Sequence, residues 1–165
     1  MEGKSSSKEI QLVIFKIGKE EFGVPISEVR EIVRLIPITP VPRAPDFVEG
    51  VVNLRGQILA IIDLAKRLKL TPSPRSDKSR IIVVELEGNI IGMIVDEVVE
   101  VLRLSSENID KAPELITTEI HEEYLKGVGK LGERLLILID LARVFSPEEV
   151  EDIKKAKEQQ SKKEE

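Results

Sequence analysis

Cysteine and tryptophan are absent from this sequence, and histidine and tyrosine occur once each. The lack of cysteine excludes disulfides, thiolate metal sites and cysteine nucleophiles, and it suits a reducing compartment such as the cytoplasm. Aromatic residues make up only 3% of the chain, and the net charge is −5. A nucleic-acid surface needs a basic stripe and rings that stack on bases, so this class of function is disfavoured.

Long hydrophobic runs are also missing. The longest apolar runs, Ile58–Ile62 and Leu135–Ile139, are far shorter than the roughly 20 residues that a membrane helix requires. The polar start Met1–Glu9 has no apolar stretch of the kind found in signal peptides. We therefore expect a cytoplasmic protein without direct membrane insertion. A chain of 165 residues can bury a sizeable core without a disulfide or a structural metal.

An internal repeat is the most informative feature that is present. Residues 11–34 align without a gap with residues 80–103, and residues 47–68 align equally well with residues 124–145. Each copy of such a repeat needs a partner to bury its core. Features that both copies share are expected to be scaffold, and features confined to one copy are candidates for function. Shared residues include Gly23/Gly92, Glu31/Glu100, Gly50/Gly127 and Asp63/Asp140.

Composition divides the chain into a body and two tails. The body is predicted to carry the two repeats, separated by a proline-containing linker that forbids regular structure. After the body, Ser146, Pro147 and Glu149 form the signature of a helix N-terminus that continues into a charged tail. The predicted parts are an N-terminal tail (1–9), a body (10–145) with repeats at 11–68 and 80–145 and a linker at 71–78, and a charged C-terminal helix or tail (146–165).

Short strands rich in valine and isoleucine dominate the body. Several are continuously apolar, which predicts burial on both faces, as where two sheets or barrels share a wall. The repeated strands and glycine turns favour two small closed barrels, and duplicated halves of this kind can exchange strands. The predicted strands are Leu12–Ile17, Val48–Leu54, Ile58–Ile62, Arg80–Leu86, Ile90–Val95 and Leu135–Ile139.

Short helices or turns are expected between the strands, each begun by a capping side chain. Ser27 and Asp96 occupy the same repeat position and are predicted to cap equivalent turns. Asp63 and Asp140 are predicted to cap the short helices Leu64–Leu68 and Leu141–Phe145.

Residues for catalysis or metal binding are scarce. His121 is the only histidine, and one imidazole among mobile carboxylates would hold a metal poorly. Asp63 and Asp140 fit helix caps better than a general acid and base. The glycines match no phosphate-binding spacing. We therefore predict no enzyme activity, no cofactor, no metal and no small-molecule substrate, and look instead for surfaces that bind other proteins.

One hairpin sequence breaks the symmetry of the repeat. Asn53, Arg55 and Gly56 occur in the first copy only, shortly after the proline-rich loop Leu35–Asp46. A guanidinium on a stiff hairpin suits recognition of a carboxylate or a backbone carbonyl, although an ordinary turn charge is the simpler interpretation. Val29 and Glu31 have counterparts in the second copy, so their first explanation is structural.

An ordered series of motifs in this chain resembles the CheW family of chemotaxis coupling proteins. The resemblance continues through Gly92–Arg103 and Tyr124–Leu141, so it covers nearly all of the chain except its tails. No single motif is decisive, but their order along the chain is specific. The motifs are Glu21–Ile26, Val29–Ile32, Ile38–Pro42, Phe47–Gly56 and Ile62–Leu64.

The resemblance implies a mainly β fold of two intertwined five-stranded SH3-like or OB-like barrels, with short connecting helices, a C-terminal helix and a groove between the barrels. It implies a non-catalytic adaptor, recruited to membrane-associated arrays, that joins the cytoplasmic tips of chemoreceptors (methyl-accepting chemotaxis proteins) to the C-terminal regulatory domain of the histidine kinase CheA. The implied receptor-side residues are Ile26, Val29, Glu31, Gly50, Asn53, Leu54, Arg55, Val98 and Val101. The implied kinase-side residues are Ile38 and Thr39.

Other functions stay open from the sequence alone. A free-standing regulatory domain related to that of CheA is the nearest alternative. An OB-like nucleic-acid module would bind single strands in a salt-sensitive way. An uncharacterised hydrolase would lose turnover when His121 or Asp63 is replaced.

Overall fold

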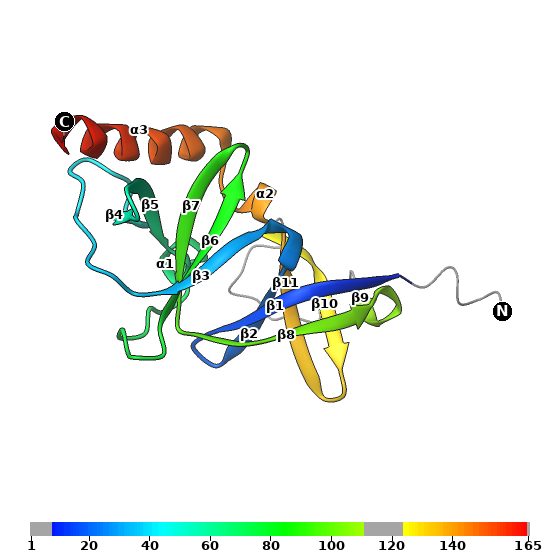
Figure 1. The fold of residues 1–165 in the computed structure, drawn as a ribbon. Coiled ribbons are helices and arrows are strands. Elements are labelled where there is room, and N and C mark those ends of the chain that lie inside the picture. The colour runs from blue at the N-terminus through cyan, green and yellow to red at the C-terminus, as the bar shows by residue number, and fades with distance from the viewer. Residues whose placement is uncertain (1–7, 111–123, 165) are drawn as a thin grey trace.

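The computed structural model describes residues 8–110 and 124–164. It contains two mixed β-sheets that lie side by side, with short helices at their junction and one longer C-terminal helix across one end (Figure 1). The predicted mainly β fold with short connecting helices and a C-terminal helix is confirmed.

The two repeats contribute equivalent elements in the same order. The first repeat contains β1 (Glu9–Ile17), β2 (Glu20–Pro25), the 3₁₀ turn η2 (Ile26–Glu28), β3 (Val29–Arg34), β4 (Val48–Leu54), β5 (Gln57–Asp63) and α1 (Leu64–Arg67). The second contains β6 (Arg80–Leu86), β7 (Asn89–Val95), β8 (Glu97–Ser105), η3 (Ser106–Asn108), β9 (Ile109–Asp110), β10 (Leu125–Leu131), β11 (Arg134–Ile139) and α2 (Leu141–Val144). The last helix is α3 (Pro147–Glu164).

All six strands predicted from composition are present, and β1 already begins at Glu9, inside the predicted tail. Composition alone does not predict β3 and β8, whose outer residues are exposed and include several charged side chains. It also does not predict β2, because this strand begins with two glutamates and contains Gly23 and Pro25. Long apolar runs therefore predict strands in this sequence, whereas strands rich in charged residues, or containing glycine and proline, are not predicted from composition.

Each sheet is built from both repeats. The six-stranded sheet has the order β8-β1-β2-β11-β10-β9, and the five-stranded sheet has the order β3-β6-β7-β5-β4. The first hairpin of each repeat (β1–β2 or β6–β7) is thus inserted among strands of the other repeat. Parallel pairing of β2 with β11 and of β5 with β7 completes this reciprocal exchange.

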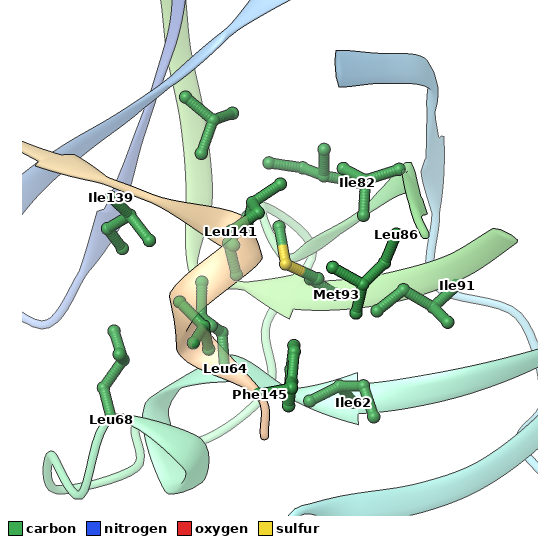
Figure 2. Close-up of a cluster of buried hydrophobic side chains, with 14 of the residues drawn as sticks. Ile62, Leu64, Leu68, Ile82, Leu86, Ile91, Met93, Ile139, Leu141 and Phe145 are labelled. Atoms are coloured by element: carbon green, nitrogen blue, oxygen red, sulfur yellow. The ribbon is translucent and has the colours of Figure 1, made fainter. Parts of the chain in front are cut away.

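Three apolar clusters explain the continuously apolar strands. One cluster lies within the five-stranded sheet, a second within the six-stranded sheet, and a third joins the two sheets. Alternate residues of one strand enter different clusters: in β5, Leu59 and Ile61 belong to the first cluster, and Ala60 and Ile62 belong to the third. Figure 2 shows this third, central cluster with side chains from both repeats. The predicted burial on both faces is confirmed.

Two of the four caps predicted for the turns and short helices between the strands are confirmed. The carboxylate of Asp63 accepts a hydrogen bond from the Lys66 amide at 3.3 Å at the start of α1. Asp140 does the same for the Ala142 amide at 3.1 Å at the start of α2. Both repeats therefore have an aspartate at this position for the same structural reason: each one caps the N-terminus of a short helix.

The predicted caps at Ser27 and Asp96 are wrong. Ser27 lies inside η2, a single turn that follows Pro25 and has no side-chain cap. No helix follows Asp96, because the chain passes directly into β8. Its carboxylate instead accepts a 2.7 Å hydrogen bond from the Gly18 amide and so holds the turn between β1 and β2.

The start of α3 has the predicted capping box. Ser146 Oγ accepts from the Glu149 amide at 3.1 Å, and Glu149 Oε1 accepts from the Ser146 amide at 2.8 Å. The helix then buries Val150, Ile153 and Ala156 in the central cluster. Because this spacing places all three on one face, α3 packs on the body through its first turns.

Candidate interaction surface

The β4–β5 hairpin carries the sequence that occurs only in the first repeat. Leu54 and Gln57 form its last strand pair, so Arg55 and Gly56 are its two turn residues. Their φ angles are 54° and 89°. Two left-handed residues match the twist of the flanking strands. Asn53 Oδ1 accepts a 2.7 Å hydrogen bond from the Gly56 amide and fixes the turn.

Arg55 forms an ion pair with Glu31 of β3. β3 and β4 are opposite edges of the five-stranded sheet, so the sheet is curled enough for its edges to meet through this pair. The Arg55 side chain remains 66% exposed. An exposed pair of this kind contributes about 0.2–1 kcal/mol to stability. The structure thus brings two of the predicted receptor-side residues together and leaves the guanidinium accessible.

The second repeat contains a corresponding ion pair that the sequence did not reveal. Glu100, the counterpart of Glu31, bonds Arg134 at 2.9 Å, and Arg134 also bonds Glu21 at 2.7 Å. These hydrogen bonds to Glu21 and Glu100 raise the pKa of Arg134. The gapless repeat alignment places Arg134 opposite Gln57, which hides its similarity to Arg55. Glu31 therefore has a structural role that both copies share.

Gly50 is buried, and its lack of a side chain has a structural cause. Its φ is 148°, and a Cβ at this position would lie 2.1 Å from the backbone oxygen of Thr39. Gly127, its counterpart, makes the same kind of close approach to the backbone of Asp110. At Gly50 this approach lets Thr39 and Val51 exchange two backbone hydrogen bonds of 2.9 Å. Gly50 therefore shapes the surface and offers no side chain to a partner.

A pocket of about 410 Å³ lies beside the hairpin. The predicted kinase-side residue Thr39 and the predicted receptor-side residue Asn53 both line it. Ile38 packs against the cluster within the five-stranded sheet, whereas Thr39 is exposed. Sequence reasoning placed these residues on separate interfaces and did not bring them together. The full lining is Ile36, Pro37, Thr39, Val51, Val52, Asn53 and Ile58.

The remaining predicted residues differ in their exposure. Ile26 is 37% exposed and Val101 is 47% exposed, which is high for large apolar side chains. Val29 and Val98, at equivalent repeat positions, are half-buried and pack against the central cluster. Leu54 is half-buried against the cluster of the five-stranded sheet. Only the exposed members can give a partner much new contact area.

The linker between the repeats is fastened to the base of the same hairpin. Arg75 lies 3.2 Å from Asp63 and 3.3 Å from Glu49. Lys66 bonds Glu49 at 2.8 Å, and this hydrogen bond raises the pKa of Lys66. Asp63 is only 3% exposed, so Arg75 compensates a buried charge. The linker therefore contributes ion pairs that attach it to the first repeat.

Other kinds of site are not found in the part of the chain that the structure describes. Within residues 8–110 and 124–164, no three or more acidic or histidine side chains gather as metal ligands would. No helix among these residues is both long and apolar enough to cross a membrane. His121, the weak metal candidate, lies outside the described residues.

Comparisons with known proteins agree with this architecture. The family model described as the CheW-like domain matches residues 11–149. A chemotaxis protein CheW of Klebsiella aerogenes is 40% identical over 140 residues, which cover 85% of this chain and 84% of that protein. A chemotaxis protein CheW of Treponema pallidum is 34% identical over 152 residues, which cover 90% of this chain and 89% of that protein.

A solved structure is also similar. The crystal structure of the scaffolding protein TtCheW from Thermoanaerobacter tengcongensis superposes with a TM-score of 0.78 at 35% identity, covering 86% of this chain and 91% of that one. The family match over residues 11–149 spans both repeats. This chain belongs to the CheW-like family.

Proposed function

We propose that this chain is a non-catalytic adaptor of bacterial chemotaxis that joins the cytoplasmic tips of chemoreceptors to the histidine kinase CheA. Its relatives are named chemotaxis proteins, and the similar solved structure is described as a scaffolding protein. An adaptor needs two binding surfaces and a rigid body between them. Two sheets that exchange strands supply such a body, because neither can shift without disturbing the other.

The observation that carries the proposal is the conformation of Arg55. The equivalent turn position in the second repeat is Gly132, with φ of 62°, and glycine adopts this conformation without a steric penalty. An L-residue in the left-handed region costs about 1–2 kcal/mol. Glu87, whose repeat counterpart is Gly18, has a similar φ of 50°, so the conformation alone does not mark a binding site. At Arg55 it is combined with an exposed guanidinium that Glu31 holds in place, and this combination is expected where a partner needs that side chain.

We assign the receptor side to the residues around this hairpin and to the exposed apolar side chains near the repeat junction. Asn53, Arg55, Ile26 and Val101 would contact the receptor directly. Glu31 would orient Arg55. Of the other predicted residues, Gly50 is buried and Val29, Leu54 and Val98 are half-buried, and we assign them the role of shaping the surface.

The kinase side is assigned to Thr39 and Ile38, through the C-terminal regulatory domain of CheA. Thr39 lines the pocket of about 410 Å³, and the apolar part of this lining suits an apolar side chain of the partner. Small interfaces of this kind are weak alone and become effective in a multivalent array. We therefore propose that the chain works in the cytoplasm, where receptor arrays recruit it to the membrane.

Binding of a chemoreceptor-tip fragment tests the role of Arg55. Arg55→Glu places like charges beside Glu31 and reverses the exposed charge, so we expect affinity to fall about tenfold, the loss typical of an interface hot spot. Lys130→Glu is the control, because it reverses an exposed charge on the equivalent hairpin of the second repeat. Both variants should melt normally. Equal losses for the two variants, or unchanged affinity for Arg55→Glu, would contradict the proposal.

A further inference from the structure

Arg67, the last residue of α1, is a nearly buried cation that the proposed function does not use. Its side chain is only 12% exposed. The guanidinium carbon lies 5.5 Å from the ring centre of Phe47, 5.1 Å from that of Tyr124 and 5.7 Å from that of Phe145. Aromatic faces attract a cation, and the attraction grows when water is excluded. Three rings around one guanidinium therefore compensate the loss of its hydration.

Two hydrogen bonds fix the same guanidinium to the C-terminal part of the chain. Its Nε donates to the Val144 carbonyl at 2.8 Å, and one terminal nitrogen donates to Glu149 Oε1 at 3.0 Å. Glu149 Oε1 also accepts the Ser146 amide in the capping box. Arg67 is thus bonded to the carboxylate that organises the first turn of α3.

Two of the three rings that surround Arg67, those of Phe47 and Tyr124, lie at the bases of the two hairpins. Phe47 directly precedes β4, and Tyr124 directly precedes β10. The Phe47 carbonyl accepts from the Asp63 amide at 2.8 Å, and the Tyr124 carbonyl accepts from the Asp140 amide at 2.9 Å. Each aromatic residue therefore closes the base of its own hairpin, and Arg67 touches both of them.

The internal repeat explains why only one copy has this arginine. The residue equivalent to Arg67 is Val144, which offers its carbonyl to the guanidinium. A cation that contacts equivalent residues of both repeats occupies the junction between them, where a second cation would be repelled. The first repeat therefore has an arginine at this position and the second a valine, because one guanidinium serves both repeats.

We propose that Arg67 is a positioning residue for partner binding, which holds the β4–β5 hairpin, the β10–β11 hairpin and α3 in one arrangement. α3 packs on β4 and β5 (Figure 1). Arg67 contacts Phe47 and Tyr124 at the bases of the two hairpins and Glu149 in α3, so all three elements meet at its side chain. The surface at Asn53–Gly56 is then presented in a fixed orientation relative to the second repeat. Such preorganisation raises affinity without adding a contact. The part of this proposal that concerns affinity rests on the proposed function.

Hydrogen exchange of the full chain tests the structural part. In Arg67→Gln we expect the amides at the starts of β4 and β10 and in the docked turns of α3 to exchange about tenfold faster than in the parent. Arg67→Lys keeps a cation among the rings but cannot reproduce both hydrogen bonds, so its effect should be intermediate. Arg143→Gln, at an arginine side chain that is 65% exposed in α2, is the matched control and should leave β4 and α3 unchanged.

Affinity for a chemoreceptor-tip fragment, measured well below the melting temperature, tests the functional part. Arg67→Gln should bind about tenfold more weakly although Asn53–Gly56 is untouched, whereas a purely structural role would leave the affinity of the folded protein unchanged. Faster exchange in α1 and α3 alone, or unchanged affinity beside faster exchange at both hairpins, would overturn the proposal. A parent chain that binds no receptor-tip fragment would refute the proposed function, and the exchange result would still decide whether Arg67 couples the hairpins.

Discussion

Individual residues of this chain divide into those fixed by backbone geometry and those left free for partners. The repeat separates the two groups, because a residue with a structural cause tends to have that cause in both copies. Gly50 and Gly127 both admit a close crossing of the backbone, and Glu31 and Glu100 both bond an arginine. Arg55 is different, since its counterpart is a glycine that avoids the strain.

Gly50→Ala tests the structural explanation of this glycine. The new Cβ would lie 2.1 Å from the backbone oxygen of Thr39, and the φ of 148° is unfavourable for alanine. We expect the free energy of unfolding to fall by more than about 2 kcal/mol. Gly18→Ala is the control, because its φ of 63° is also left-handed but no atom lies within 4 Å of the added Cβ. That variant should lose only about 1–2 kcal/mol, the cost of the left-handed conformation alone. Equal urea midpoints for the two variants would refute the explanation.

At the scale of elements, the sequence predicts what is buried or capped locally and misses what depends on distant contacts. All strands that contribute buried residues to the central core, except β2, were predicted, as were the caps at Asp63, Asp140 and Ser146. The edge strands β3 and β8 were not predicted, because half of each faces solvent. The contact of Arg75 with Asp63 was also missed, since nothing local shows where an irregular linker will lie.

Asp63→Ala and Asp140→Ala measure what the linker adds to a helix cap. Both variants remove a cap that contributes about 1 kcal/mol. Asp63 is also buried and accepts from Arg75 at 3.2 Å, and a hydrogen bond between charged groups adds about 1.5–3 kcal/mol. We therefore expect Asp63→Ala to lose about 2.5–4 kcal/mol in chemical unfolding, and Asp140→Ala to lose about 1 kcal/mol. A loss at Asp63 no larger than at Asp140 would show that the Arg75 contact is energetically silent.

At the scale of the whole molecule, the two repeats form one body because they exchange hairpins. β3 pairs with β6 of the other repeat, and β8 pairs with β1, so each repeat lacks a neighbour for its third strand when alone. The sequence allows this exchange but does not specify it, since the same alternating pattern fits pairing within either repeat. The pocket that Thr39 and Asn53 both line could not be predicted either. The sequence indicated that the proline-rich loop is stiff, but not where the loop lies against the β4–β5 hairpin.

The central claim is that this rigid body holds a receptor and a kinase at once. The most direct measurement is a titration of the chain with the C-terminal regulatory domain of CheA, in the absence and in the presence of a chemoreceptor-tip fragment. The account predicts that the kinase domain binds in both cases and that all three components form one complex. Absence of binding to the kinase domain, or displacement of that domain by the receptor fragment, would contradict it.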